Sequence, residues 1–222
     1  MEMTKLFTYI VIKNVYYPQV SFGISANTFL LFHIFTFAYT HRPKPIDMII
    51  SHLSLIHILL LFTQAILVSS DLFESWNIQN NDLKCKIIIF LNRVMRGISI
   101  CTTCLLSMLQ AITISPSTSF LKKFKHISAN HTLGFILFSW VLNMFITSNL
   151  LLFIVPTPNR IGASLLFVTE NCYVLPMSYT HRSLFFILMV LRDVIFIGLM
   201  VLSSGLHGDY FVQTKETVPA PT

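Results

Sequence analysis

The run from Gly97 to Ile114 contains no charged side chain, and it restricts the possible folds of this chain more than any other feature. At about 1.5 Å per residue in a helix, the run nearly crosses a hydrocarbon core of about 30 Å. Extended back to Cys85, it crosses that core comfortably. The sequence therefore predicts a transmembrane helix at 85–114.

Two arginines lie within this predicted helix. Arg93 and Arg96 are three residues apart, so they share a helical face, on the order of 12 to 16 Å beyond Cys85. An Arg near the centre of a membrane helix costs about 2.5 to 3.5 kcal/mol on insertion scales. We therefore expect this face to look into a helix bundle or a watery cavity and to mark a site. The alternative is that both side chains lie higher and extend to the headgroups.

The composition indicates a polytopic membrane protein. Of 222 residues, 54% are hydrophobic and only 11% are charged, which is too little charge to cover a soluble globule of this size. The formal net charge is +6, but the basic residues are scattered and no aromatic-basic module accompanies them. Contact with anionic membrane lipid explains this charge more simply than nucleic acid does, so we expect no nucleic-acid partner.

Chemical sites are not apparent in the sequence. The cysteines lack the paired spacing of a zinc site, so no metal is expected. We find no nucleophile–base pair and no phosphate-binding glycine loop at matching depths. The sequence therefore predicts neither an enzyme nor a cofactor.

Five apolar segments are long enough to cross a membrane, at about 15–39, 46–68, 85–114, 131–155 and 183–205. The predicted fold class is an all-α, polytopic membrane helix bundle. We divide the chain into an extracellular N-terminus at 1–14, a transmembrane domain at 15–205 and a polar cytoplasmic tail at 206–222. Charge counting gives six cations on each side, and the cluster of Lys122, Lys123 and Lys125 favours the orientation that places it inside.

Two polar residues lie deep in the first two predicted spans. Asn27 and His57 are each ten or eleven residues from opposite ends of antiparallel neighbours, on the order of 15 Å deep. Because a polar group at that depth needs a polar partner, we predict that they approach each other as an intramembrane polar core. The alternative is that His57 bonds a backbone carbonyl of its own helix.

Four stretches resemble the vomeronasal type-1 receptors, which are seven-helix G-protein-coupled receptors for pheromones. They are RVMRGISICTTCLLSMLQAITISP at 93–116, PIDMIISHLSLIHILLL in the second span, FSWVLNM in the fourth and RDVIFIGLMVLSSG in the fifth. The resemblance covers about residues 15–205. It implies a rhodopsin-like receptor topology with five of the seven helices present, because the pattern ends after Gly205.

The resemblance also implies particular residues and partners. Cys85 and Cys172 match the receptor disulfide between the third helix and the second extracellular loop. The implied partners are membrane lipid, an unknown small-molecule or pheromone-like ligand and a heterotrimeric G protein. The candidates to face the G protein are Gln110, Lys122, Lys123 and Lys125.

Asp193 is the predicted counter-ion of the basic face. It lies on the order of 14 Å into the fifth span, at the depth of Arg93 and Arg96, and the third and fifth helices are neighbours in the fold that the chain resembles. We predict that Asp193 pairs with Arg96 or Arg93, and that the remaining Arg faces the ligand cavity beside Asn92. The alternative is that Asp193 neutralises the adjacent Arg192.

The predicted function is a chemosensory receptor of the vomeronasal type-1 kind in the plasma membrane, with its N-terminus extracellular. The absence of helices six and seven leads us to expect impaired signalling. The alternative is a non-signalling membrane remnant that is retained in the endoplasmic reticulum or associates with intact receptors.

Overall fold

The computed structural model describes residues 7, 10–40, 44–68, 82–114, 129–148, 151, 154–156, 166–167, 172–174 and 179–217. Five long helices make up most of this part: α2 (Tyr17–Thr40), α3 (Pro45–Val68), α5 (Asp82–Ile114), α6 (Ala129–Ser148) and α7 (Tyr179–Thr217). A short π-helix, η1 (Ile12–Tyr16), precedes α2. The predicted all-α fold with five helices is confirmed.

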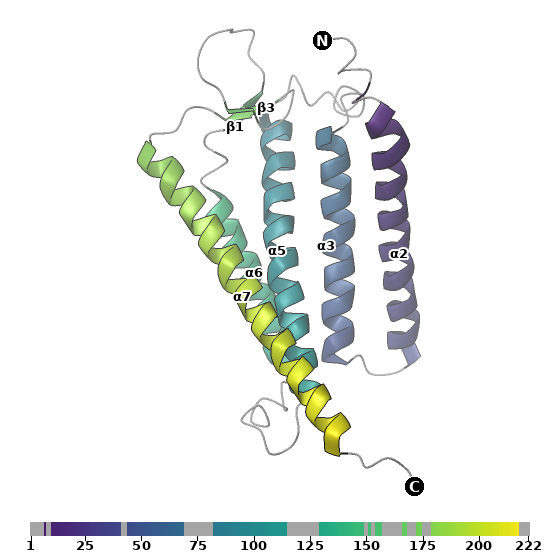
Figure 1. Cartoon of the computed structure of the whole chain (residues 1–222). Helices are drawn as coiled ribbons and strands as arrows, with labels where there is room; N and C mark the ends of the chain where they lie inside the picture. Colours follow the sequence, from purple (N-terminus) through teal and green to yellow (C-terminus); the bar gives the residue numbers. More distant parts are fainter. Residues whose placement is uncertain are drawn as a thin grey trace.

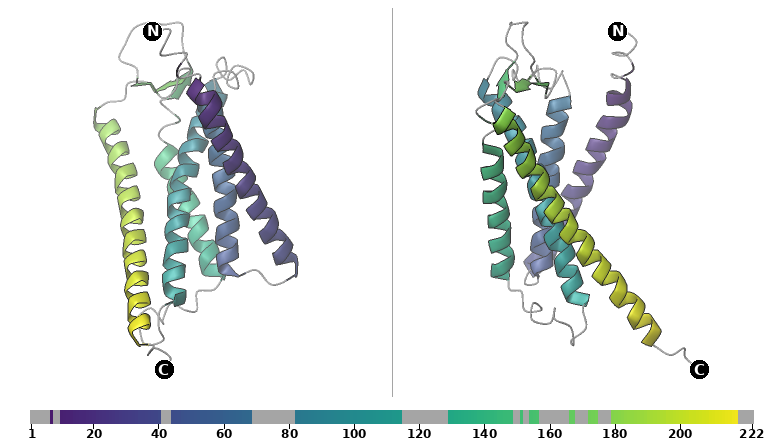
Figure 2. Two further views of the ribbon diagram at one scale, coloured as in Figure 1. Left: turned by 45° about the vertical axis from the view of Figure 1, so that its right-hand side comes forward. Right: turned by 60° about the vertical axis from the view of Figure 1, so that its left-hand side comes forward.

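Helix α5 is the centre of the bundle. It contacts α3, α6 and α7, whereas α2 packs against α3. Figure 1 shows α2, α3 and α5 side by side, with α6 behind and α7 crossing obliquely in front. In the right-hand view of Figure 2 the lower end of α7 points away from the other helices. Because α5 packs against three other helices, polar side chains on several of its faces can form hydrogen bonds with neighbouring helices.

A small antiparallel sheet lies at the N-terminal end of α5 and corrects the predicted fourth span. Its strands are β1 (Ile154–Pro156), β2 (Leu166–Phe167) and β3 (Cys172–Val174), in the order β1-β3-β2, and β1 contacts α5 (Figure 1). Helix α6 ends at Ser148, so the predicted span 131–155 is too long. Ile154 and Val155 are β-branched, and Val155 precedes a proline, which favours extended backbone.

Helix α7 is longer than the predicted fifth span, 183–205. It begins at Tyr179 and continues to Thr217, so the backbone shows no break at residue 206, where the predicted tail begins. The reason is local: no proline occurs between Pro176 and Pro219, and a helix interior ends most readily at a proline. Polar composition alone did not indicate the end of this helix.

Four helices in the described part are long and apolar enough to cross a membrane: Pro45–Val68, Leu83–Thr113, Asn130–Ser148 and Ser183–Gly205. Helix α2 coincides with the other predicted span, 15–39, and exposes Phe22, Phe29, Phe32 and Phe35. Exposed apolar side chains on membrane helices face lipid at no cost, because lipid tails are as apolar as the side chains.

Tight packing, rather than exclusion of water, holds α3 against α5. Ile56 of α3 and Val94, Met95 and Ile98 of α5 form one buried cluster. A second cluster lies further along α5 and comprises Ile49, Leu105, Leu109 and Ile136. In lipid such clusters stabilise mainly through van der Waals contact, so the loss of contacts is the expected cost of a cavity.

We predict that Ile56→Ala lowers the free energy of unfolding by about 2 kcal/mol, the low end for buried Ile→Ala, because the water-transfer contribution is small in lipid. Ile56 is 0% exposed, whereas its neighbour Leu55 is 47% exposed. Leu55→Ala is therefore the matched control and should change stability little. Thermal unfolding followed by labelling of the buried thiols of Cys101 and Cys104 measures both variants. Equal losses in the two variants would contradict this packing.

Candidate functional site: a buried arginine held by three helices

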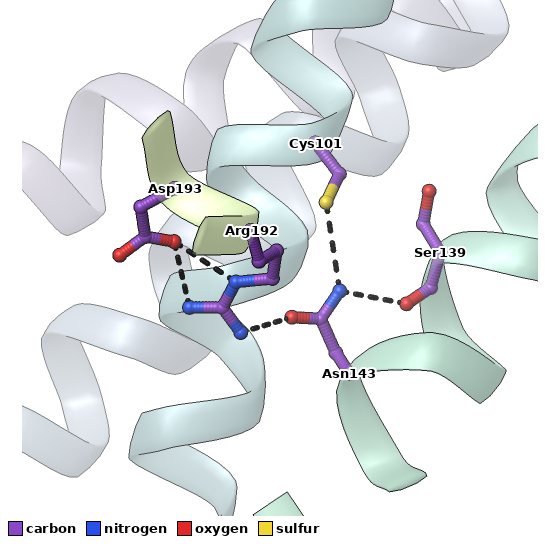
Figure 3. Close-up of polar contacts among 5 residues, drawn as sticks. All are labelled: Cys101, Ser139, Asn143, Arg192 and Asp193. Carbon is purple, nitrogen blue, oxygen red and sulfur yellow. Dashed lines mark hydrogen bonds and ion pairs between the residues drawn. The ribbon is translucent and has the colours of Figure 1, made fainter. Parts of the chain in front are cut away.

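Arg192 on α7 is a buried charged residue that contacts both its own helix and α6. Its side chain is 4% exposed, and its Nη2 lies 2.8 Å from Asp193 Oδ1 in an ion pair. Its Nε donates to the same oxygen at 2.9 Å, and its Nη1 donates to Asn143 Oδ1 on α6 at 2.7 Å (Figure 3). The guanidinium is thereby neutralised on one side and hydrogen-bonded to a different helix on the other.

Asn143 connects this arginine to two helices. It is 0% exposed. Its Nδ2 donates to the backbone oxygen of Ser139 at 2.7 Å and lies 3.6 Å from Cys101 Sγ on α5. In Figure 3 its amide lies between the arginine of α7 and the thiol of α5. Both ends of the amide are therefore satisfied, as a buried polar group in a membrane requires.

Gly97 on α5 leaves the space that the side chains of Arg192 and Asn143 occupy. A Cβ added there would collide with Asn143 Oδ1 and would lie 2.5 Å from Arg192 Nη1. The absence of a side chain thus allows α6 and α7 to bring their polar groups directly onto the α5 backbone. Small residues serve the same purpose at close helix contacts in membranes generally.

The structure corrects the predicted partner of Asp193. Asp193 pairs with the adjacent Arg192, so the predicted pairing with Arg96 or Arg93 is wrong and the alternative holds. Arg192 is almost fully buried, so its charge needs a counter-ion. Asp193 is the next residue on the same helix, and its carboxylate can neutralise the guanidinium without a contact between two helices. Arg93 is half-buried and Arg96 is exposed. Within the described part of the chain, neither has a hydrogen-bond or ion-pair partner.

Asn92, predicted to lie beside the ligand cavity, is directed toward α3. Its Nδ2 donates to Thr63 Oγ1 at 3.1 Å and to Gln64 Oε1 at 3.0 Å. It therefore contributes to the α3–α5 contact, and a role in ligand binding stays a prediction.

Asn27 and His57 are not partners, which corrects the predicted polar core. Asn27 Nδ2 donates to the Gly23 backbone oxygen one turn earlier in α2, at 2.8 Å. His57 Nε2 lies 2.9 Å from Ser99 Oγ on α5. Similar depth in the two helices was not enough to form a pair. Asn27 bonds a backbone oxygen of its own helix, and His57 bonds a hydroxyl group of α5 instead.

A junction that the sequence did not indicate joins α3, α5 and α6. The indole Nε1 of Trp140 donates to His52 Nε2 at 3.0 Å, and Thr102 Oγ1 lies 3.4 Å from His52 Nδ1. Because Nε2 accepts, the imidazole proton is on Nδ1, where it faces Thr102. A histidine and a tryptophan in apolar spans of neighbouring helices were the available signal, but spacing along the chain does not reveal which faces meet.

The remaining predicted site residues are only partly within the described chain. Cys85 is disulfide-bonded, and Cys101 and Cys104 are free and buried. The side chain of Cys172, the expected partner of Cys85, lies outside the described side chains. Gln110 is exposed near the C-terminal end of α5, and the cluster Lys122, Lys123 and Lys125 lies outside the described residues.

Comparisons with known proteins agree on the family. Residues 10–219 match the model of the vomeronasal organ pheromone receptor family, which comprises the type-1 receptors. The chain belongs to this vomeronasal receptor family. It is 95% identical, over 92% of its length, to vomeronasal receptor-like protein 4 of Homo sapiens, of which it covers 99%.

Other vomeronasal receptors are longer than this chain. Vomeronasal type-1 receptor 5 of Gorilla gorilla gorilla is 70% identical over 65% of the chain, and the match spans 40% of that receptor. Vomeronasal type-1 receptor 51 of Mus musculus is 44% identical over 91% of the chain, and the match spans 63% of it. Squid rhodopsin matches the fold with a TM-score of 0.58 at 17% identity, covering 89% of this chain and 56% of the rhodopsin. This vomeronasal receptor family member thus has a G-protein-coupled-receptor-like membrane fold.

We predict that Gly97→Ala destabilises this vomeronasal receptor bundle by about 1 to 3 kcal/mol, the usual range for overpacking. The added methyl group would displace Asn143 or Arg192, and both are fixed by hydrogen bonds. Gly134 of α6 has nothing within 4 Å of an added Cβ, so Gly134→Ala is the matched control. The control should be neutral or stabilising by up to about 1 kcal/mol, because Ala restricts the unfolded chain. Thermal midpoints that fall equally in both variants would contradict the close contact at Gly97.

Proposed function

We propose that this protein is a chemosensory receptor of the vomeronasal type-1 kind, located in the plasma membrane with its N-terminus extracellular. It binds a small molecule between the outer halves of its helices and couples to a heterotrimeric G protein. The single observation that carries this proposal is the match to the vomeronasal receptor family over residues 10–219. The polar contacts of α5 to α3, α6 and α7 support it, because they couple the helices that a ligand would contact.

A second candidate function is a non-signalling membrane protein that is retained or associates with intact receptors. The observation that favours it is helix α7, the least buried of the four candidate spans. Its exposed apolar side chains are distributed along most of its length and include Leu184, Phe186, Ile187, Leu191, Val194, Ile195, Val201 and Leu202. Such a surface would allow α7 to pack against a helix of another receptor within the membrane. Impaired signalling is the outcome that we expect if this second candidate function is correct.

The experiment that tests the receptor function uses epitope tags and nucleotide exchange. We expect an N-terminal tag to be labelled on intact cells and a C-terminal tag only after permeabilisation. In membranes of these cells, a purified heterotrimeric G protein should exchange nucleotide faster than in membranes without the protein. Replacing Lys122, Lys123 and Lys125 together with Gln should abolish this acceleration, and replacing them with Arg should preserve it, because their charge is the proposed contact.

Two outcomes decide against the receptor function. Tags that remain inside the cell, or surface tags with no acceleration of exchange, would favour the non-signalling candidate. Co-purification with a differently tagged intact vomeronasal type-1 receptor would then distinguish association from simple retention.

The proposed disulfide joins Cys85 to Cys172. The backbone supports it, since β3 begins at Cys172, β3 pairs with β1, and β1 contacts α5, which carries Cys85 near its start. We predict that Cys85→Ser, Cys172→Ser and the double variant lose stability equally, by about 2 to 5 kcal/mol. Peptide mapping without reduction should recover the two cysteines in one linked species. Cys104→Ser, at a free thiol, is the control, and additive losses in the double variant would contradict the pair.

A further inference from the structure

One side of α5 is polar through the middle of the helix. Five polar residues lie on this side at spacings of three or four positions: Asn92, Arg96, Ser99, Thr103 and Ser107. At about 100° per residue, they fall within an arc of about 80°. Four of them are half-buried, and Arg96 is exposed. We call these five residues the polar seam.

The opposite side of α5 is apolar and covered by other helices. Val94, Met95 and Ile98 are buried in the cluster that includes Ile56 of α3, and Leu105 is buried in the second cluster. Covered apolar positions and incompletely covered polar positions are therefore segregated on α5. In a membrane this is the reverse of what lipid contact favours, because lipid offers no partner for polar groups.

Neighbouring helices reach only the edges of the polar seam. On the α3 edge, Ser99 Oγ lies 2.9 Å from His57 Nε2. On the α7 edge, Ser107 Oγ lies 2.8 Å from Ser203 Oγ. Arg96 lies between these edges in rotation about the helix axis, and it has no hydrogen-bond or ion-pair partner within the described part of the chain.

Arg96 also lies near the middle of its membrane span. The candidate span runs from Leu83 to Thr113. Arg96 is 13 residues after the first of these and 17 before the second, about 20 and 26 Å along the helix. A hydrocarbon core of about 30 Å centred on this span places Arg96 well below both headgroup levels. A cation at that depth faces protein or water rather than lipid tails.

The carboxylates whose side chains are described do not neutralise Arg96. Asp193 is 35% exposed, and its Oδ1 is engaged by both Nε and Nη2 of Arg192. Asp47 lies in the first turn of α3, where its Oδ2 accepts from the Lys44 backbone N–H at 3.1 Å. A carboxylate from outside these helices is therefore the group that complements Arg96.

We propose that the polar seam is the docking surface for a membrane-spanning helix of another protein, which carries a carboxylate near its centre. The carboxylate pairs with the planar guanidinium of Arg96, and the hydroxyl groups of the seam bond polar groups along the same helix. The seam extends about 22 Å from Asn92 to Ser107, which is the length of a helix contact rather than of one bound group. Spacings of three and four residues are those at which two helices meet at a crossing angle of about 20°.

The inference deepens the second candidate function, association with another membrane protein, and rests on it. It names the surface and the chemistry of the partner, and this surface is different from the exposed apolar side chains of α7. Binding is measured without a G protein, so its outcome is separate from that of the receptor function. Co-purification with an intact receptor tests association itself, whichever surface is used.

Synthetic transmembrane helices serve as the binding probes. Each consists of leucine and alanine and carries one central polar residue, which is Glu, Gln or Lys. The full chain, with a donor fluorophore on a C-terminal tag, is placed in phosphatidylcholine vesicles with acceptor-labelled probe, and energy transfer is followed against the ratio of probe to lipid. We expect the Glu probe to reach half-saturation at a ratio at least about tenfold lower than the Gln probe, because only the carboxylate forms a charge-assisted pair.

Variants of Arg96 identify the group that binds the carboxylate. Arg96→Gln should weaken binding of the Glu probe by about tenfold or more, to the level of the Gln probe. Arg96→Glu should reverse the preference and select the Lys probe, a gain that misfolding does not produce. Lys44→Gln is the control, at an exposed cation at the start of α3, and should bind each probe as the wild type does.

A bulky apolar side chain tests whether the contact extends along the seam. Thr103 lies two helical turns beyond Arg96, so Thr103→Phe should weaken binding of the Glu probe by about tenfold or more while the charge of Arg96 is kept. Leu137 of α6 is 57% exposed and lies outside the polar seam. Leu137→Phe is therefore the matched control and should leave binding unchanged.

Four results would overturn the proposal. The first is equal binding of the Glu and Gln probes by the wild type. The second is unchanged binding of the Glu probe by Arg96→Gln and Arg96→Glu, whose folding is checked by helical circular dichroism. The third is energy transfer between two copies of the chain that requires Arg96 and that the Glu probe does not reduce, which assigns the seam to a second copy. The fourth is loss of Glu-probe binding in vesicles that contain phosphatidylglycerol, which assigns Arg96 to a lipid phosphate.

Discussion

The need to satisfy Arg192 within an apolar bundle is the constraint on which the arrangement of α5, α6 and α7 depends. A guanidinium that is 4% exposed requires both a counter-charge and hydrogen-bond acceptors. Asp193 supplies the charge from the same helix, Asn143 supplies the acceptor from α6, and Gly97 leaves the space on α5. Each contribution comes from a different part of the chain, so the network forms only when the three helices have assembled.

Helix α5 is the element through which the other helices are coupled. Toward α3 it presents Ser99 and Thr102, which meet two histidines, and toward α7 it presents Ser107, whose Oγ lies 2.8 Å from Ser203 Oγ. Hydrogen bonds of this kind between membrane helices are each worth about 0.6 kcal/mol on average, so they fix orientation more than they supply stability. Such a helix is suited to a receptor because a change at one face alters contacts at the others.

Much of the fold was predictable because membrane insertion imposes strict length and polarity requirements. The long apolar runs predicted five helices, and the family resemblance predicted their receptor-like order. The fourth span was wrong at its end, where these requirements no longer apply: Ile154 and Val155 are apolar enough to continue α6 but pair as a strand. The apolar part of α7, Ser183–Gly205, has the predicted bounds, and the polar residues that follow it continue the same helix. At both places backbone preference and neighbouring segments, rather than hydropathy, decided the secondary structure.

The sequence by itself determined that Arg93, Arg96, Arg192 and Asp193 lie within membrane helices at similar depth, because depth follows from residue count and the fixed rise of a helix. It also determined that each needs a polar environment. Only the tertiary structure decided which groups meet, since the rotation of each helix about its axis depends on packing against its neighbours. That rotation brings Asn143 to Arg192, directs Asn92 to α3, separates Asn27 from His57 and leaves Arg93 and Arg96 without a counter-ion in the described part of the chain.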